Sequence, residues 1–190
     1  ECMRDQELLD RIRRDHVAAI TGALERHGND LAHLADIVAK AFKAKARVFF
    51  CGNGGSACDA MHIAGEFVGR FVEDRAALPA IALSADSGIL TAVGNDYSFE
   101  DVYARQIEAL GHGNDILIAL STSGKSPNIL KALAAAQKQG LKTVLFTGEK
   151  GKNSNAAEQV FIVPSTITAH IQEAHMVMLH ALASLVESRI

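Results

Sequence analysis

The chain has 190 residues, of which 48% are hydrophobic and 22% are charged, and its formal net charge at pH 7 is −3. This length and composition are typical of one globular domain with a sizeable core and exclude a disordered chain. The negative charge and the lack of a Lys/Arg cluster argue against nucleic acid as a partner, because binding a phosphate backbone requires a basic surface.

The chain also lacks the marks of a membrane or secreted protein. No apolar run approaches the roughly 20 residues of a membrane span, and the charged stretch 1–15 contains no apolar signal-peptide core. Its cysteines, Cys2, Cys51 and Cys58, form no CxxC pair, as expected in a reducing compartment. We therefore expect a cytoplasmic protein that binds neither membrane nor nucleic acid.

Taken in chain order, the apolar spacing first predicts two helices, over 5–26 and 30–42, separated at Gly28. Short apolar runs that are typical of buried strands then alternate with helical patterns. The strands are expected at 47–51, 79–83, 115–120, 142–147 and 159–164. The later helices are expected at 56–71, 98–110, 126–139 and 169–188.

Strands that alternate with helices form a parallel sheet with both faces covered. We therefore predict an α/β fold, with a doubly wound five-stranded parallel sheet flanked by helices, in one domain spanning 1–190. Residues 1–45 would form an N-terminal helical extension, and residues 46–190 would form the α/β core. Because ligands of such folds bind beyond the carboxyl ends of the strands, the chemistry is expected in the loops that follow them.

Two of these loops carry distinctive residues. The segment from Cys51 to Ser56 is rich in glycine and leads into a helix that Ser56 is expected to cap, although a turn without ligand fits this loop equally well. The segment from Ser121 to Ser126 places four hydroxyl groups at a helix N-terminus, with Pro127 in its first turn. Such a loop is suited to hold a phosphate; the alternative is a capped loop with no ligand.

Two helices carry candidate chemical groups. His62 and Glu66 are four residues apart and share one helix face, where they would ligate a metal or act as base and orienting group. A solvated pair is the alternative, but the neighbouring positions are apolar. In the last helix, Gln172 and His180 are predicted to face one site, whereas His175 lies on an apolar seam and is predicted to be structural.

In this order, the motifs resemble those of the SIS (sugar isomerase) domain family, and within it the sedoheptulose 7-phosphate isomerases, over roughly residues 5–188. The resemblance rests on the two loops above, on Asp59, His62 and Glu66, on Gly94-Asn-Asp96, on Ser121 to Asn128, and on Ile171-Gln-Glu173 with His180. Two positions depart from this pattern. Relatives usually have Arg or Lys in place of His170, and many have Gln in place of Met61.

This resemblance implies a flavodoxin-like SIS domain and assigns residues to the site. Glu66 and His180 would be the catalytic acid–base pair. One zinc ion per subunit would be bound by His62, Glu66, Gln172 and His180. The sugar phosphate would contact Asn53, Gly54, Gly55, Glu66, Asn95, Asp96, Ser121, Thr122, Ser123, Ser126 and Gln172.

The implied activity is an aldose–ketose isomerisation in a homotetramer whose active sites lie at subunit interfaces. Sedoheptulose 7-phosphate would become D-glycero-D-manno-heptose 7-phosphate through an enediol(ate), as the first step of ADP-heptose synthesis for lipopolysaccharide core or another surface glycan. One alternative is a non-catalytic phosphosugar-binding protein of the replication-associated DiaA type, which lacks the acid–base carboxylate and the final histidine. Another is an isomerase acting on a pentose or hexose phosphate.

Overall fold

The computed structural model describes residues 2–190, with side chains from Met3 onward, so that Glu1 of the predicted extension lies outside the described residues. Its centre is a five-stranded sheet, and all its strand pairs are parallel. The strand order is β2-β1-β3-β4-β5, which is the flavodoxin-like order. The strands are β1 (Val48–Gly52), β2 (Ala80–Ala82), β3 (Ile116–Leu120), β4 (Lys142–Gly148) and β5 (Gln159–Val163). The predicted fold class is confirmed.

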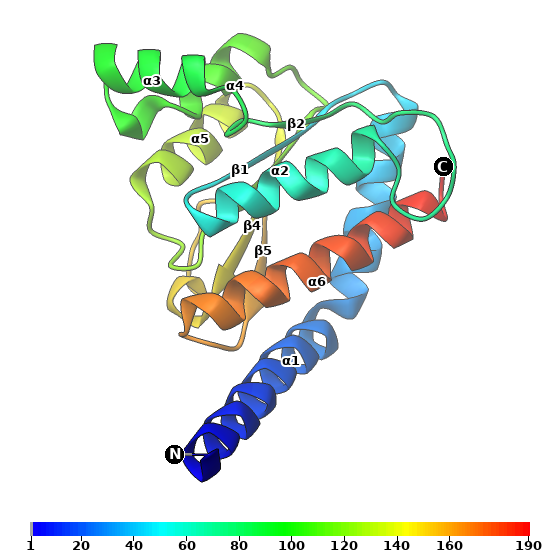
Figure 1. Ribbon diagram of the computed structural model, residues 1–190. Helices are drawn as coiled ribbons and strands as arrows, with labels where there is room; N and C mark the ends of the chain where they lie inside the picture. Colours follow the sequence, from blue (N-terminus) through cyan, green and yellow to red (C-terminus); the bar gives the residue numbers. More distant parts are fainter. Residues whose placement is uncertain (1) are drawn as a thin grey trace.

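Helices cover both faces of the sheet (Figure 1). On one face lie α1 (Cys2–Lys43), α2 (Gly55–Val68) and α6 (Thr168–Glu187), and on the other lie α3 (Ser87–Asp96), α4 (Ala104–Leu110) and α5 (Pro127–Lys138). Every residue of β1 and β3 is buried, because successive side chains enter opposite cores. Phe50 of β1 packs into the first core, for example, and Phe49 into the second.

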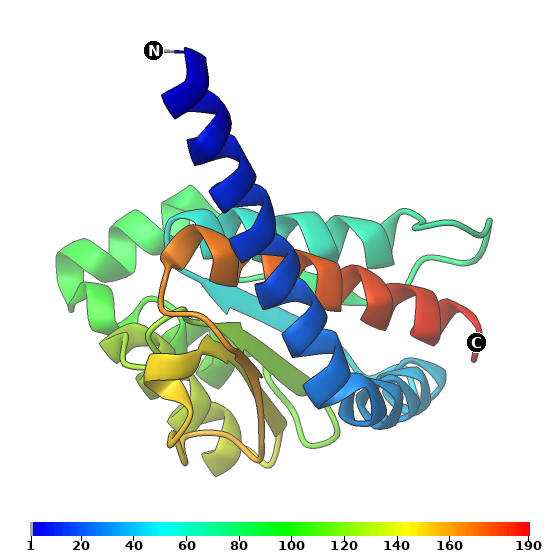
Figure 2. The same ribbon diagram turned by 90° about the horizontal axis from the view of Figure 1, so that it is seen from below.

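The predicted break at Gly28 is wrong, because α1 is one continuous helix of 42 residues. Gly28 is exposed, and a glycine inside a helix costs only about 1 kcal/mol. The turns on either side bury Ala23 and Leu34 completely, which outweighs that cost. The N-terminal part of α1 extends away from the rest of the chain (Figure 2).

The predicted helix over 98–110 is also partly wrong. Its first residues form a short 3-10 helix, η1 (Phe99–Asp101), and only Ala104–Leu110 are α-helical. The sequence reasoning missed α3, which buries none of its residues and therefore has a weak apolar pattern. The available signal was Asp86, whose carboxylate caps α3 by accepting a hydrogen bond from the backbone of Ile89.

The sheet order brings the carboxyl ends of β1 and β3 together, with α2 and α5 leaving toward opposite faces. This is the topological switch point at which doubly wound folds bind ligands. Both of the loops singled out in the sequence begin here. Within residues 2–190, none of the helices combines the length and apolar character needed to cross a bilayer.

Candidate active site

The glycine-rich loop after β1 turns directly into α2. Gly54 is the residue before the helix and has a φ of +57°, a conformation that favours glycine. The helix begins at Gly55, so the expected cap at Ser56 is wrong; Ser56 is buried inside the first turn. A Cβ atom at Gly55 would lie 2.7 Å from the Gln172 side-chain nitrogen, so a larger residue at this position would displace the Gln172 amide.

The serine-rich loop after β3 is tightly held. The hydroxyl oxygens of Ser121 and Ser126 are 3.2 Å apart, and Ser121 is buried. Ser126 is the residue before α5, and its side chain makes no cap hydrogen bond to the helix. Pro127 occupies the start of the helix, as predicted. The loop thus presents hydroxyl groups at the positive end of a helix dipole, an arrangement that suits an anion.

A pair of amide side chains joins the two loops. Asn53 of the glycine loop and Asn128 of α5 each donate a side-chain N–H to the oxygen of the other, at 2.8 Å in both directions. Asn128 is buried, although Asn53 is only partly so. Sequence reasoning did not assign Asn128 a role, and no local pattern identifies a partner that lies 75 residues away. The pair fixes the distance between the two proposed phosphate-binding elements.

Three side chains gather between α2 and α6. Nε2 of His62 is 3.0 Å from a carboxylate oxygen of Glu66 and 3.4 Å from Nε2 of His180. One ligand atom from each of the three lies within 4.8 Å of the others. The structure therefore brings together three of the four residues expected to bind a metal, two of them 118 residues apart in the chain.

The geometry of this group fits a zinc ion. Ligand atoms about 2.0–2.2 Å from a tetrahedral zinc lie roughly 3.3 Å from one another, close to the two spacings observed. Two imidazoles and one carboxylate are a ligand set of catalytic zinc sites, which leave a position for water or substrate. Burial lowers the pKa of His180, and nearby His62 lowers it further although Glu66 opposes the shift. The neutral imidazole favoured in this way is the form that binds metals.

Gln172 lies at the other end of the same pair of helices. Helices α2 and α6 run side by side in the same direction, with Gln172 against Gly55 and His180 against His62. Eight residues separate Gln172 from His180, which is about 12 Å along the helix axis. Gln172 therefore lines the path between the glycine loop and the three-residue group, and its role as a fourth ligand stays a prediction.

Asn95 and Asp96 lie at the C-terminal end of α3, on the exposed surface. The Asn95 amide donates to the Asp96 carboxylate at 2.8 Å. Helix α3 lies on the side of the molecule toward which the strands point (Figure 1). Among the described residues, no side-chain hydrogen bond joins these two to the glycine or serine loop, so their contact with substrate stays a prediction.

The two departures from the family pattern lie outside the three-residue group. His170 is buried and faces α1, where its ring centroid is 4.2 Å from that of His16. His16 in turn forms an ion pair with Glu173. Met61 is exposed on α2. The predicted structural role of His175 agrees with its complete burial.

Comparisons with known proteins agree with this arrangement. The family model for the SIS domain matches residues 14–148. The phosphoheptose isomerase of Aquifex aeolicus is 44% identical over 185 residues, covering 97% of each chain. That of Thermodesulfovibrio yellowstonii is 47% identical over 158 residues, covering 83% of this chain and 79% of the relative. The structure of a phosphoheptose isomerase from Francisella tularensis matches with a TM-score of 0.90 at 31% identity, covering 97% of this chain and 98% of that one.

Proposed function

The chain belongs to the SIS domain family and, within it, to the phosphoheptose isomerases, and from this premise we propose that it converts sedoheptulose 7-phosphate into D-glycero-D-manno-heptose 7-phosphate. The observation that carries the proposal is the group formed by His62, Glu66 and His180, beside loops suited to a phosphate. A non-catalytic binding protein is not favoured, because Glu66 and His180, the proposed acid–base pair, are both present and both lie within hydrogen-bonding distance of His62.

The phosphate of the open-chain ketose binds at the serine loop. The hydroxyl groups of Ser121 and Ser126 donate to the phosphate oxygens, and the α5 dipole stabilises their charge. His62 lies seven residues beyond Gly55, about 10 Å further along α2. A sugar chain of several carbons therefore extends from the phosphate toward the three-residue group. The remaining proposed contacts are Asn53, Gly54, Gly55, Asn95, Asp96, Thr122, Ser123 and Gln172.

Glu66 and His180 perform the proton transfers. The Glu66 carboxylate removes a proton from C1 of the ketose, giving an enediol(ate), and returns a proton to C2 to give the aldose. The neutral His180 imidazole moves the proton between the two oxygens, O1 and O2. Both residues stand at hydrogen-bonding distance from His62, which orients them.

Zinc is the metal that we propose for this site, one ion per subunit, held by His62, Glu66 and His180 with Gln172 as the fourth ligand. When bound, it would polarise the carbonyl and stabilise negative charge on the neighbouring oxygens. Because Glu66 and His180 would serve both as ligands and as proton-transfer groups, their coordination would have to be loose.

Assembly and location are further parts of the proposal. Leu8, Leu9 and Ile12 lie within one arc of about 100° on α1 and are 41–58% exposed, although they are large and apolar. Burial against other copies would remove this surface from water, which supports the homotetramer with sites at its interfaces.

Free Cys51 and Cys58 agree with a reducing cytoplasm. The product would supply ADP-heptose for a lipopolysaccharide core or another surface glycan.

The test is incubation with sedoheptulose 7-phosphate in deuterated water, followed by NMR of the products. Proton transfer through Glu66 predicts an aldose that carries solvent deuterium at C2. Glu66→Gln is expected to lower kcat by roughly 10²- to 10⁴-fold. Glu108→Gln, which changes an exposed carboxylate on α4, is the matched control and should leave kcat unchanged. Near-normal turnover by Glu66→Gln would refute the assignment of the base.

A further inference from the structure

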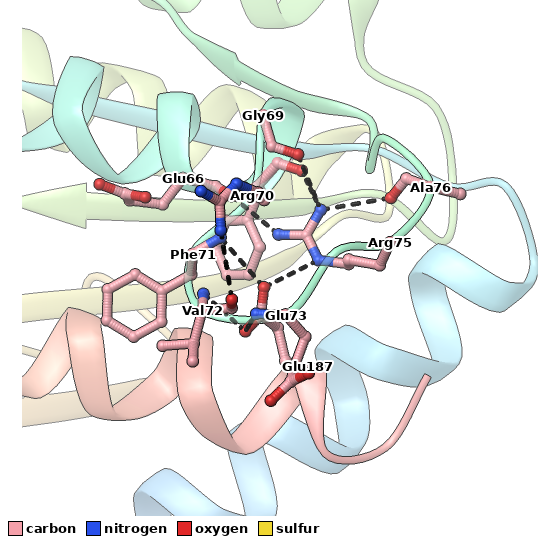
Figure 3. Close-up of polar contacts among 10 residues, drawn as sticks. Glu66, Gly69, Arg70, Phe71, Val72, Glu73, Arg75, Ala76 and Glu187 are labelled. Carbon is pink, nitrogen blue, oxygen red and sulfur yellow. Dashed lines mark hydrogen bonds and ion pairs between the residues drawn. The ribbon is translucent and has the colours of Figure 1, made fainter.

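The loop after α2 crosses the ends of both helices that carry the candidate active site (Figure 3). It is held by Glu187, in the last turn of α6. The Glu187 carboxylate accepts hydrogen bonds from the backbone N–H groups of Phe71, Val72 and Glu73, at 3.1, 3.1 and 3.2 Å. Three consecutive backbone donors therefore converge on one side chain more than 110 residues away.

Arg75 joins the same carboxylate to the end of α2. Its Nε donates to Glu187 at 3.0 Å, and its two terminal nitrogens donate to the carbonyl oxygens of Glu66 and Phe67 at 2.7 and 2.8 Å. These carbonyls belong to the last turn of α2, where a helix leaves its acceptors unpaired and its dipole favours a cation. The Arg75 side chain thus satisfies carbonyl oxygens at the C-terminal end of α2, whose C-cap residue is Gly69 (Figure 3).

This ion pair is almost completely removed from water. The side chain of Glu187 is only 3% exposed, and that of Arg75 is 11% exposed. Removing two charges from water costs free energy that their attraction recovers only with good geometry, so a buried pair is weak evidence for stability alone. The pair does define geometry, because the planar guanidinium fixes the directions of its donors.

The first residues of the loop contact the candidate active site. The ring of Phe71 stacks on the His180 imidazole, with centroids 5.2 Å apart and planes 22° apart. The backbone of Phe71 is bound by Glu187, and the backbone of Glu66 is bound by Arg75. One network therefore contacts a residue of the site on α2 and the ring that covers the histidine on α6.

We propose that Arg75, Glu187 and Phe71 are positioning residues, which hold His180 at the distance and orientation to His62 and Glu66 that the reaction requires. The proposal rests on the proposed function, because it assigns these residues to the same site. A displacement of about 1 Å at a reacting group can cost up to roughly 100-fold in rate. None of the three touches the serine loop, so substrate anchoring should survive their loss.

The test compares Glu187→Gln, Arg75→Lys and Phe71→Leu with a matched control. Asp36→Asn is the control, because Asp36 pairs with Arg189 at 2.6 Å and joins the same end of α6 to α1, without contacting the site. For each purified full-length variant, kcat and KM are measured together with the melting temperature. The affinity for Co²⁺ and its visible absorption spectrum are measured on metal-free protein.

We expect Glu187→Gln and Phe71→Leu to lower kcat and Co²⁺ affinity by roughly 10- to 100-fold, with an altered spectrum. KM should change less than about threefold, since the lost interactions act on the reacting end. Arg75→Lys keeps the positive charge but loses the planar guanidinium with its several fixed donors. Its kcat and Co²⁺ affinity should therefore fall between those of wild type and those of Glu187→Gln. Asp36→Asn should keep wild-type kcat and spectrum, even where its melting temperature falls.

Wild-type kcat, Co²⁺ affinity and spectrum in folded Glu187→Gln and Phe71→Leu would overturn the proposal, because the network would then only stabilise the fold. If Glu187→Gln does not fold, Phe71→Leu decides the matter, since it keeps an apolar side chain in a partly buried position. If the wild-type enzyme shows no isomerisation, the proposed function fails, and the Co²⁺ measurements still test the positioning. If it binds no Co²⁺, the kcat values alone decide.

Discussion

We expect the buried imidazole of His175 to make the protein sensitive to acid, and replacing it with leucine tests this directly. His175 is completely buried in α6, with its ring 5.9 Å from that of Phe146. Burial lowers its pKa from 6.5 to about 4, against a smaller opposing effect of the Thr147 backbone. As the pH falls, the unfolded chain therefore takes up this proton before the folded chain does.

The sign and size of the effect follow from that shift. A folded-state pKa below the unfolded value means that the stabilising contribution is complete above pH 6.5 and is lost as the pH falls toward 4. The difference of about 2.5 pKa units corresponds to about 3 kcal/mol, lost at roughly 1.4 kcal/mol per pH unit. His175→Leu removes the titrating group, so the variant should lose less stability on acidification than wild type by this amount.

The assay is urea unfolding at several pH values between 7.5 and 4. The quantity to compare is the change in unfolding free energy with pH, because any constant effect of packing a leucine cancels. His112→Gln, a change at an exposed histidine, is the control and should follow wild type. Parallel stability curves for His175→Leu and wild type would show that the imidazole is not kept neutral by the fold, and would refute the reasoning.

Three further predictions concern the site and the assembly. Gly55→Ala should displace the Gln172 amide and lower kcat/KM by roughly 10-fold or more, with little loss of stability. Unchanged kinetics would show that Gln172 does not take part in substrate binding or catalysis. Removing metal with a chelator should abolish most activity and zinc should restore it, whereas full activity of verified metal-free protein would contradict a zinc enzyme. Ile12→Glu should lower the mass found by light scattering, while Arg14→Glu, on another face of α1, should not; an unchanged mass for Ile12→Glu would exclude this face from the interface.

The sequence was sufficient to predict the sheet and the loops at its carboxyl edge. The five strands are short, continuous apolar runs, and a buried parallel sheet produces that pattern. The contact between His62 and Glu66 was also predictable, because spacing of four residues places two side chains on one helix face. The convergence of His180 on this pair followed from the family resemblance and not from any local pattern.

Long-range polar contacts were not predictable from local patterns. Nothing near Arg75 in the sequence indicates that its partner is Glu187, because an Arg in a polar loop is ordinarily solvated. The exposed helix α3 was missed because it lacks an apolar stripe, and the break at Gly28 was wrongly expected because tertiary packing outweighs one unfavourable residue. Both errors have the same cause. Packing against distant segments decides whether a helix is continuous or buried, and local patterns do not show that packing.

The projecting first turns of α1 have a consequence for how the enzyme behaves on dilution. Residues 3–15 are almost all exposed, and this part of α1 projects away from the rest of the chain (Figure 2). A helical segment of about this length is marginal in water when it has nothing to pack against. If other copies of the chain supply that packing, the helical order of residues 3–15 depends on the protein concentration, as the law of mass action requires. The helix content seen by circular dichroism should then fall at nanomolar concentrations, together with dissociation of the subunits.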